Sequence, residues 1–577
     1  MSSEKTFSKN QLLQGVSGAP GLACGPAFLW QKAELHLPDC GGQNPEVELA
    51  RLEAAIQTAI VQIKQLNEKL NNEGHSEEAK VFDAHVQLVQ DKGLVNRVKK
   101  GLTSGMNVET VWNTTVEAYA AQLEAMPDPL FRLRAADLRD VGERVLRILL
   151  KVETRSELHE PSVVIARDLT PSETVSMKKE YVLAFCTAEG GPTSHTSILA
   201  KALRIPAVVS IGQEILQVPG GTQLLVDGSA GSITARPDKQ TCEAFFARQQ
   251  ASNSTAQEEL ATAHQRAYTL DGKSVEVVAN VGGAEDARTA LEHGAEGIGL
   301  FRTEFVFLQR QSPPTEEEQY AAYHEVLQVM EQRPVVIRTL DAGGDKELTY
   351  LHMPAEANPF LGNRAIRLCL SEPEFFKQQL RALLRAGVGH DLRIMFPMIA
   401  SRTELRAAKQ LIAEAKEEVL ASGSALPEKL QVGIMVEIPS TAVLAAQFAK
   451  EVDFFSIGTN DLTQYTLAAD RTNPKLAYLN DPCHPAVLNL IQQTAEAAHK
   501  AGIWWGVCGE MAGDADAIPL LLALGVDELS MSPGLIPHAK SLIRKLSLPQ
   551  AKEVLELALE QDSAASVRKV VKNFSHG

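Results

Sequence analysis

The spacing of apolar residues changes along this chain and divides it into regions of different texture. Between about residues 45 and 151, apolar positions recur every three or four residues, as in VELARLEAAIQTAIVQIKQLNEKL. This spacing is typical of amphipathic helices, because it gathers the apolar side chains on one face. Four such stretches occur, so a block of about four helices is expected there.

Shorter apolar runs lie on both sides of this helical block and predict strands. Residues 11–30 read as a strand, a turn and a second strand, and SVVIARD, YVLAFCT, AVVSIG and TQLLVDG follow the block. A helix, TSHTSILAKALR, separates the second and third of these runs. We therefore expect one α/β domain into which the helical block is inserted.

A third pattern fills the second half of the chain. Eight apolar strand candidates occur there, most of them separated by amphipathic helices: VEVVANV, GIGLFRT, PVVIRTL, LRIMFPMI, VGIMVEIP, FFSIGTND, WWGVCGEM and ELSMS. Eight strands with intervening helices over roughly 300 residues predict a (β/α)8 TIM barrel.

The predicted fold class is therefore multidomain α/β. Residues 1–44 and 152–237 are assigned to the α/β domain, 45–151 to the inserted helical bundle, 238–266 to a linker helix and 267–577 to the barrel. The linker is assigned because it is polar and contains neither glycine nor proline, so it predicts one uninterrupted helix between two cores.

Composition and charge exclude several classes of protein. The chain has 577 residues, 44% apolar and 22% charged, which suits three or four globular domains and not a disordered chain. Its 56 basic and 72 acidic side chains give a net charge of −16, which argues against nucleic acid or an anionic membrane as a general partner. The seven scattered cysteines form no CxxC pair, so neither a disulfide framework nor a cysteine zinc site is expected. No signal peptide or bilayer-spanning stretch is found, which predicts a cytoplasmic protein.

Polar residues stand near the C-terminal ends of several predicted barrel strands. They are Arg302, Arg338, Glu437, Asn460, Asp461 and Cys508. Barrels of this type place their chemistry at that end of the strands, so these residues predict an active site. For any one of them alone, a surface ion pair, a turn residue or a small buried thiol is the simpler interpretation.

The sharpest local motif is GGPTSHTS at residues 190–197, which follows a predicted strand and opens a predicted helix. The glycines permit close backbone approach, and Thr193 or Ser194 can cap the helix. His195 would lie in the first turn, where free N–H groups and the helix dipole favour an anion. This setting suits a histidine that carries a phosphoryl group, although a lone histidine near a helix start more often has no such role.

Residues 190–197, extended through SILAKALRIPAVVSIG, resemble the phosphohistidine domain of the phosphoenolpyruvate-utilising enzymes. Other motifs are similar to those of the Enzyme I family of bacterial sugar phosphotransferase systems: GVSGAPGLACGPA, DPLFRLRAADLRDVGERVL, ARDLTPSET, GIGLFRTEFVF, VVIRTLDAGGDK, NPFLGNRAIR, MVEIPS, SIGTNDLTQYTLAADR and GVCGEMAGD. They extend from about residue 15 to about residue 532. The resemblance implies a swivelling phosphohistidine domain and an enzyme that phosphorylates its own histidine from phosphoenolpyruvate. The phosphoryl group then passes to the histidine phosphocarrier protein HPr, the first step of the system, and pyruvate is released.

The resemblance also implies roles for individual residues. His195 would carry the phosphoryl group, and Cys508 would protonate the enolate that leaves. The substrate-binding residues would be Arg302, Arg338, Arg364, Asn460, Asp461 and Arg471, with Lys346 nearby. Glu437 and Asp461 would bind Mg²⁺, which prefers hard oxygen ligands. Thr174 would form a hydrogen bond to His195.

The expected partners follow from the same resemblance. The helical bundle would bind the phosphocarrier, and acidic residues such as Glu77, Glu78 and Asp83 would suit a basic partner, although such a run is more often a solvated face. The barrel would form a homodimer. Pro192 stands where many Enzymes I have arginine, so the acceptor stays open between HPr and a fructose-type HPr. Asn363 also departs from the family pattern, because it replaces an aromatic residue.

Two other classes of protein share part of this pattern. A dikinase or phosphoenolpyruvate synthase shares the phosphohistidine domain and the barrel. Such an enzyme also needs a large nucleotide-binding domain, and the stretch ahead of Gly15 is not expected to supply one. A regulatory phosphoprotein would sense phosphoenolpyruvate without turnover, and the full set of expected reactive residues argues against it.

Overall fold

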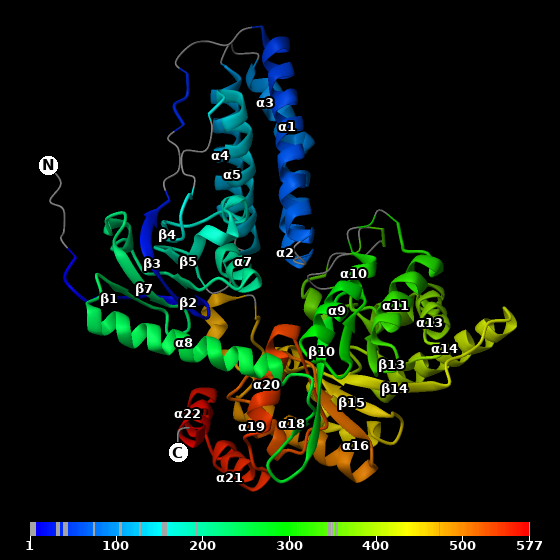
Figure 1. Cartoon of the computed structure of the whole chain (residues 1–577). Helices are drawn as coiled ribbons and strands as arrows, with labels where there is room; N and C mark the ends of the chain where they lie inside the picture. Colours follow the sequence, from blue (N-terminus) through cyan, green and yellow to red (C-terminus); the bar gives the residue numbers. More distant parts are fainter. Residues whose placement is uncertain are drawn as a thin grey trace. The chain divides into compact units, whose positions relative to one another are not determined.

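The computed structural model describes residues 7–30, 35–38, 44–72, 76–102, 107–125, 129–152, 158–191, 194–308, 310, 312–343, 348, 350–351, 356–471 and 473–575. The chain divides into two compact units, residues 1–253 and 254–577, which are described separately below (Figure 1). The division falls within helix α8 (Lys239–Ala261), in the segment for which the sequence predicts a linker helix.

The first unit is built on an eight-stranded sheet with the order β1-β8-β7-β3-β4-β5-β6-β2. Its strands are β1 (Gln11–Gln14), β2 (Val16–Ala19), β3 (Leu22–Leu29), β4 (Ser162–Ala166), β5 (Val182–Thr187), β6 (Ala207–Val209), β7 (Gln223–Asp227) and β8 (Ser232–Ala235). The short helices α6 (Pro171–Ser176) and α7 (His195–Leu203) accompany the sheet. The prediction of one α/β domain around residues 11–30 and the four later strands is confirmed.

The first twenty residues of this sheet differ from the prediction, because they form three strands and not two. β1 and β2 are separated only by Gly15, yet β1 pairs with β8 and β2 pairs with β6 at opposite ends of the strand order. The sheet therefore curls so that its two edges approach each other at Gly15. A side chain could not be accommodated there, since a Cβ atom on Gly15 would lie 2.6 Å from the carbonyl oxygen of Val209.

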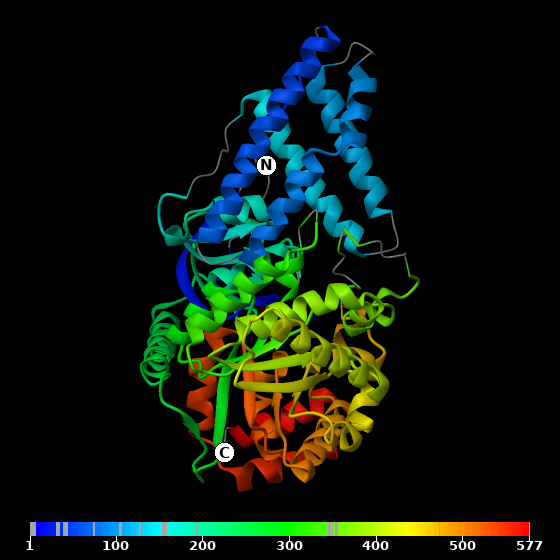
Figure 2. The same cartoon turned by 90° about the vertical axis from the view of Figure 1, so that its right-hand side faces the viewer.

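The insertion contains five helices, where about four were expected. They are α1 (Pro45–Asn72), α2 (Ser76–Val89), α3 (Lys92–Leu102), α4 (Val108–Glu124) and α5 (Pro129–Leu150), which lie side by side in Figures 1 and 2. The additional break separates α2 from α3, because the carboxylate of Asp91 accepts a hydrogen bond from the N–H of Leu94 (2.7 Å) and starts a new helix. Trp112 is fully buried at the centre and donates its indole N–H to the carbonyl of Gly142 (2.9 Å).

The second unit is a closed barrel of eight parallel strands. They are β10 (Ser274–Val281), β11 (Ile298–Arg302), β12 (Val335–Arg338), β13 (Asp391–Phe396), β14 (Lys429–Val436), β15 (Phe454–Ile457), β16 (Trp504–Val507) and β17 (Glu528–Met531). β10 pairs with both β11 and β17 and so closes the barrel, while the short β9 (Ala267–Tyr268) pairs antiparallel with β10. All eight predicted strands are confirmed.

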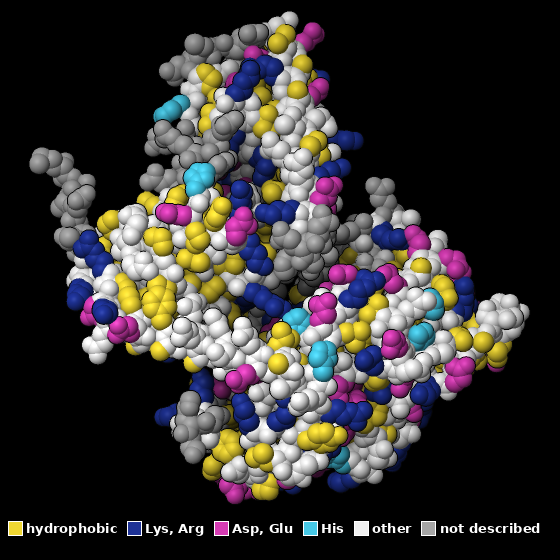
Figure 3. All heavy atoms as spheres, in the orientation of Figure 1, with side chains coloured by type: hydrophobic (Ala, Val, Ile, Leu, Met, Phe, Trp, Pro, Cys, Tyr) yellow, Lys and Arg dark blue, Asp and Glu magenta, His cyan; other side chains and the backbone are white. Residues whose placement is uncertain are grey.

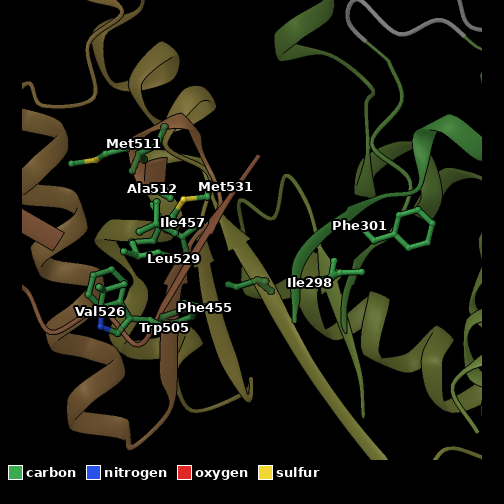
Figure 4. Packing of buried hydrophobic residues seen from close by; sticks show 14 of the residues in the cluster. Ile298, Phe301, Phe455, Ile457, Trp505, Met511, Ala512, Val526, Leu529 and Met531 are labelled. Carbon is green, nitrogen blue, oxygen red and sulfur yellow. The ribbon is translucent and has the colours of Figure 1, made fainter. Parts of the chain in front are cut away.

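Helices surround the barrel strands. They are α9 (Ala284–Glu292), α10 (Glu304–Phe307), α11 (Glu316–Met330), α12 (Ile366–Ser371), α13 (Pro373–Ala386), α14 (Arg402–Ala421), α15 (Pro439–Val443), α16 (Ala445–Phe448), α17 (Thr459–Leu467), α18 (Pro485–Ala501), α19 (Ile518–Ala523), α20 (Ile536–Ile543), α21 (Leu548–Leu559) and α22 (Ala564–Ser575). Outward-facing strand residues such as Ile457, Leu529 and Met531 pack in the large core between strands and helices (Figure 4). Alternate residues, including Phe454 and Cys508, form a second cluster inside the barrel.

The outer surface of the barrel unit is mixed in charge. Basic and acidic side chains are interspersed on the face shown in Figure 3. Within the described part of the chain, no helix combines the length and the apolar character needed to cross a membrane.

One arginine of the last helix bridges three carboxylates of the barrel unit. Arg568 on α22 forms two bonds to the carboxylate of Asp481 (2.6 and 2.9 Å) and one contact each with Asp514 (2.8 Å) and Asp516 (3.4 Å). These aspartates belong to the loops that follow α17 and β16. The guanidinium therefore holds three carboxylates that would otherwise repel one another.

Replacing Arg568 with methionine is expected to destabilise the barrel by about 1–3 kcal/mol, because three partly buried carboxylates lose their shared counter-charge. Differential scanning calorimetry would show this as a lower unfolding temperature. Lys572→Met is the control: Lys572 is 61% exposed and lies 3.7 Å from Asp516, and its loss should cost less than about 0.5 kcal/mol. Equal effects of the two substitutions would contradict the prediction.

Candidate active site

The C-terminal ends of the barrel strands bring most of the predicted polar residues together. β12 ends at Arg338, whose buried guanidinium donates to Glu304 (2.7 Å) and lies 3.1 Å from the carboxylate of Asp341. Burial disfavours its charge, but the carboxylates of Glu304, Asp341 and Glu437 outweigh this effect and raise the pKa of Arg338. The strand end therefore carries a permanent positive charge.

Asp341 joins Arg338 to a second buried arginine. Arg364 is 2% exposed, and its Nη2 donates to Asp341 (2.9 Å) while its Nη1 donates to the hydroxyl of Tyr465 (3.2 Å). Nη1 also lies 3.9 Å from a carboxylate oxygen of Asp461. Arg338 and Arg364 are thus fixed in one network before any ligand binds.

Asp461 extends this network to a third arginine. It is the third residue of α17, and its Oδ1 lies 3.5 Å from Nη1 of Arg471. The same oxygen is buried and makes no hydrogen bond within the described part of the chain. The backbone N–H of Arg471 donates to the side chain of Gln464 (3.3 Å), which holds the arginine near α17.

Glu437 follows β14 and is only 1% exposed. One of its oxygens accepts a hydrogen bond from the backbone N–H of Met398 (2.6 Å). Burial, followed by repulsion from the carboxylates of Asp461 and Asp341, raises the pKa of Glu437 to about 8. Its ionised form is therefore poorly compensated by the protein alone.

Glu437 and Asp461 fit the binding of a divalent cation. A buried carboxyl group with a raised pKa and a buried carboxylate oxygen without a hydrogen bond are the groups that a cation would stabilise. No cluster of three or more histidine, cysteine, aspartate or glutamate side chains among the described residues could hold a metal ion by itself. Mg²⁺ usually takes only one or two carboxylates and completes its shell with substrate oxygens and water.

Asn460 connects two of the loops at this end of the barrel. Its side-chain oxygen accepts from the N–H of Glu510 (3.0 Å), and its amide group donates to the Glu510 carboxylate (3.4 Å). Glu510 lies two residues after Cys508. The pair therefore fixes the start of α17 beside the loop that follows β16.

Cys508 lies at the end of β16, 4% exposed, within the barrel cluster that includes Phe454 and Met435. Its thiol points to the carbonyl of Ile457 (3.7 Å), and its own carbonyl accepts from the side chain of Asn280 (3.1 Å). Burial raises the pKa of the Cys508 thiol to about 11. The thiol therefore keeps its proton at neutral pH.

Two of the named barrel residues, Arg302 and Asn363, have exposed side chains. Arg302 pairs with Arg338 along the β11–β12 ladder, and its side chain is exposed. Lys346 lies outside the described residues. Asn363 is exposed, and its side chain donates to the hydroxyl of Ser371 (3.5 Å).

His195 is in the first unit and is the first residue of α7, as the motif predicts. Ser194 caps this helix by accepting from the N–H of Ser197 (3.4 Å). The His195 side chain is 26% exposed, and its Nδ1 lies 3.9 Å from the carboxylate of Asp137 on α5. One ring nitrogen therefore faces a carboxylate.

The predicted hydrogen bond between Thr174 and His195 is wrong in this structure. The Thr174 hydroxyl donates to the carbonyl of Thr170 (3.0 Å), one turn earlier in the chain. This local hydrogen bond competes with the expected one to His195, because a threonine hydroxyl in a helix lies close to the carbonyl four residues before it.

Of the three acidic residues expected to meet a basic partner, the structure describes the side chain of Asp83. The side chains of Glu77 and Glu78 lie outside the described part of the structure. Asp83 is exposed on α2 and accepts from the amide group of Asn67 (3.1 Å). Pro192 and Thr193 also lie outside the described residues.

Sequence reasoning missed the residues that hold the named ones in place. Glu304 and Asp341 pair with Arg338, Tyr465 contacts Arg364, and Asp137 faces His195. A signal existed for the first two, since each follows a strand-end arginine by two or three positions. Asp137 offers no local signal, because it comes from a helix far away in the sequence.

Family models match nearly the whole chain. The PEP-binding domain of PEP-utilising enzymes matches residues 256–548, the N-terminal domain matches residues 14–134, and the mobile domain matches residues 158–231.

Curated relatives and solved structures give similar matches. A phosphoenolpyruvate-protein phosphotransferase from Priestia megaterium is 44% identical over 567 residues, which cover 98% of this chain and 99% of that protein. One from Bacillus subtilis (strain 168) is 43% identical over 565 residues, 97% of this chain and 99% of the relative. Among solved structures, a solution structure titled Enzyme I (nEIt) is 38% identical and covers 42% of this chain and 99% of its own, with a TM-score of 0.37.

Proposed function

The chain belongs to the phosphoenolpyruvate-utilising enzymes, and from this premise we propose how its residues transfer a phosphoryl group from phosphoenolpyruvate to a protein. The reaction is that of a phosphoenolpyruvate-protein phosphotransferase, the first step of the sugar phosphotransferase system. One observation carries the assignment of the site. Arg338, Arg364 and Arg471 are linked through Asp341 and Asp461 at the ends of the barrel strands.

The arginine network binds the substrate. Phosphoenolpyruvate carries a phosphate and a carboxylate, and a guanidinium group matches both anions with two parallel N–H donors. Arg302, exposed at the end of β11, and Asn460, at the start of α17, supply further contacts. Because the buried arginines are already held by Asp341 and Asp461, little reorganisation is needed when the phosphoryl charge shifts during transfer.

Glu437 and Asp461 would hold Mg²⁺, which would neutralise part of the phosphoryl charge when bound. Asp461 also faces Arg364 and Arg471, so the residues that would bind the cation and the anion belong to one network. Glu437 completes the pair from the neighbouring strand end, β14.

His195 attacks the phosphorus atom through Nε2, the nitrogen that does not face Asp137. The bond between phosphorus and the enol oxygen breaks, and its electron pair stays on the enolate. Cys508 then gives its proton to the enolate carbon, which forms pyruvate. The raised pKa of its thiol suits an acid that must arrive protonated.

The phosphoryl group passes from His195 to a histidine phosphocarrier of the HPr type. The helical insertion at residues 45–151 is the carrier-binding part of the chain, and the barrel forms a homodimer. The enzyme works in the cytoplasm. Passage of the group onward distinguishes this role from a regulatory sensor that would keep it.

The test uses the full chain with ³²P-labelled phosphoenolpyruvate and Mg²⁺, with and without a purified HPr-type carrier. We expect an acid-labile, base-stable label on the chain, transfer of that label to the carrier and continuous pyruvate release. Labelling without transfer or pyruvate turnover would favour the regulatory alternative. No labelling at all would contradict the proposed function.

Replacing Glu437 with glutamine should raise the Mg²⁺ concentration needed for half-maximal labelling by about tenfold or more, because a charged ligand becomes neutral at nearly constant size. Isothermal titration with Mg²⁺ would measure the same loss without turnover. Glu417→Gln, at an exposed position of α14, removes the same charge and should leave both values unchanged. Equal Mg²⁺ requirements in the two variants would refute the ligand assignment.

A further inference from the structure

Asp137 lies between two histidines in the first unit. Its Oδ1 lies 3.2 Å from Nε2 of His85 on α2 and 3.9 Å from Nδ1 of His195 on α7. Asp137 itself is on α5 and is mostly buried. Three helices that are separate in the sequence therefore converge on one carboxylate.

His85 is built into the interior and holds this carboxylate. It is fully buried, and its ring packs edge-on against Phe82 (centroid distance 5.6 Å). Its Nε2 points to Asp137, while its Nδ1 lies 3.8 Å from the carboxylate of Asp140. Asp140 in turn accepts from the backbone N–H of Ser172 (3.3 Å).

Asp137 is buried, with the His85 ring nitrogen as its hydrogen-bond partner among the described residues. A buried carboxylate is unfavourable unless a donor or a positive charge compensates it. His85 gives Asp137 one N–H donor, and Nδ1 of His85 still has no hydrogen bond in the described structure. Among the described residues, the second histidine near Asp137 is His195, whose Nδ1 lies 3.9 Å from the carboxylate.

We propose that Asp137, held by His85, is a positioning residue that orients the His195 ring and balances the positive charge that this ring acquires on phosphorylation. The proposal rests on the proposed function. It concerns the first unit only and assigns no new contact to phosphoenolpyruvate.

The charge balance shows why a carboxylate is needed at this position. When Nε2 of His195 uses its lone pair to bind phosphorus, the bond to the enol oxygen breaks and the enolate keeps that electron pair. The ring still holds the proton on Nδ1 and therefore becomes cationic. Asp137 faces that N–H and stabilises the cation, as the carboxylate of a serine-protease triad stabilises its imidazolium. No proton has to leave, and the same pairing serves the reverse step.

Other charged groups near His195 do not replace this contact. Asp168, from the loop after β4, accepts from the hydroxyl of Thr196 (3.4 Å), the residue next to His195. Asp140 lies 3.8 Å from His85. It also favours the charge of the half-buried Arg144, four positions later. Among the ion pairs that the structure shows for His195, Asp137 is the one partner.

The experiment compares full-length Asp137→Asn with the unchanged chain. Asparagine keeps the size and removes the charge, so rapid-quench phosphorylation of His195 from phosphoenolpyruvate should slow about tenfold to a hundredfold. KM for phosphoenolpyruvate should stay within about twofold, since all the residues assigned to that substrate belong to the other unit. In ¹⁵N NMR spectra, the ring resonances of phosphorylated His195 should differ from those of the unchanged chain, because the Nδ1 proton loses its carboxylate partner.

Glu214→Gln is the matched control, because it removes one exposed carboxylate from the same unit. Its rate and ring spectrum should equal those of the unchanged chain. His85→Gln keeps a side-chain donor and is the second variant, should Asp137→Asn fold poorly. We expect His85→Gln to lower the phosphorylation rate less than Asp137→Asn does. When both substitutions are combined, the fold-loss of rate should be smaller than the product of the two separate fold-losses.

A normal phosphorylation rate together with a normal ring spectrum in Asp137→Asn would overturn the proposal. So would a loss of thermal stability with no change in the ring spectrum of phosphorylated His195, because that pattern describes a purely structural residue. Failure of the proposed function is distinguishable, since the unchanged chain would then take no label from phosphoenolpyruvate.

Discussion

Replacing His195 with alanine is expected to abolish labelling of the chain by phosphoenolpyruvate. The imidazole supplies the attacking nitrogen, and alanine offers no nucleophile at the start of α7. The helix itself should persist, because its cap is the Ser194 side chain, which accepts from the N–H of Ser197. The measurement is acid-labile, base-stable ³²P incorporation per chain, with circular dichroism to show that the fold is kept.

His264→Ala is the control, because it removes an exposed histidine near the end of α8. This variant should be labelled to the same extent as the unchanged chain. Labelling of His195→Ala at normal stoichiometry would show that another residue carries the phosphoryl group.

Replacing Cys508 with alanine should reduce pyruvate turnover by about 10²–10⁴-fold, the usual contribution of a general acid. The thiol is buried and keeps its proton, since burial raises its pKa to about 11. Alanine removes this proton donor but leaves Arg338, Arg364 and Glu437 in place, so the affinity for phosphoenolpyruvate should change little. Steady-state kinetics and direct binding measurements separate the two effects.

The stereochemistry of protonation gives a second readout for Cys508. With the thiol present, the proton should reach one face of the enolate, whereas water would protonate the released enol on either face. Cys186→Ala provides a comparison, because it removes another fully buried thiol, on β5, and should preserve stereochemistry. Normal turnover and one-sided protonation in Cys508→Ala would mean that a different group is the acid.

The barrel could be predicted in detail because its strands are short apolar runs set apart by helices. All eight runs became strands, and their last residues identified Arg302, Arg338, Glu437 and Cys508 as neighbours at one end. Parallel strands in a closed barrel have the same direction, so this conclusion needs no knowledge of side-chain contacts.

Long-range contacts account for what the sequence could not reveal. β8 is four residues long and lies between turns, and it becomes a strand because β1 and β7 pair with it. The break between α2 and α3 is a local exception, because it depends on the carboxylate of Asp91, which the spacing of apolar residues does not distinguish. The pairing of Asp341 with both Arg338 and Arg364 likewise exists only after the barrel has formed.

The curled sheet around Gly15 determines the order in which the first unit can fold during synthesis. Gln11 pairs with Ala235, so the first strand emerges from the ribosome long before its partner exists. The inserted helices contact one another and can fold before Ala235 has been synthesised, because contacts close in sequence form fastest. Until Ala235 has been translated, β1 is an unpaired edge that can recruit other chains. The protein is therefore most exposed to aggregation as a nascent chain, and the strand made first is among the last to be secured.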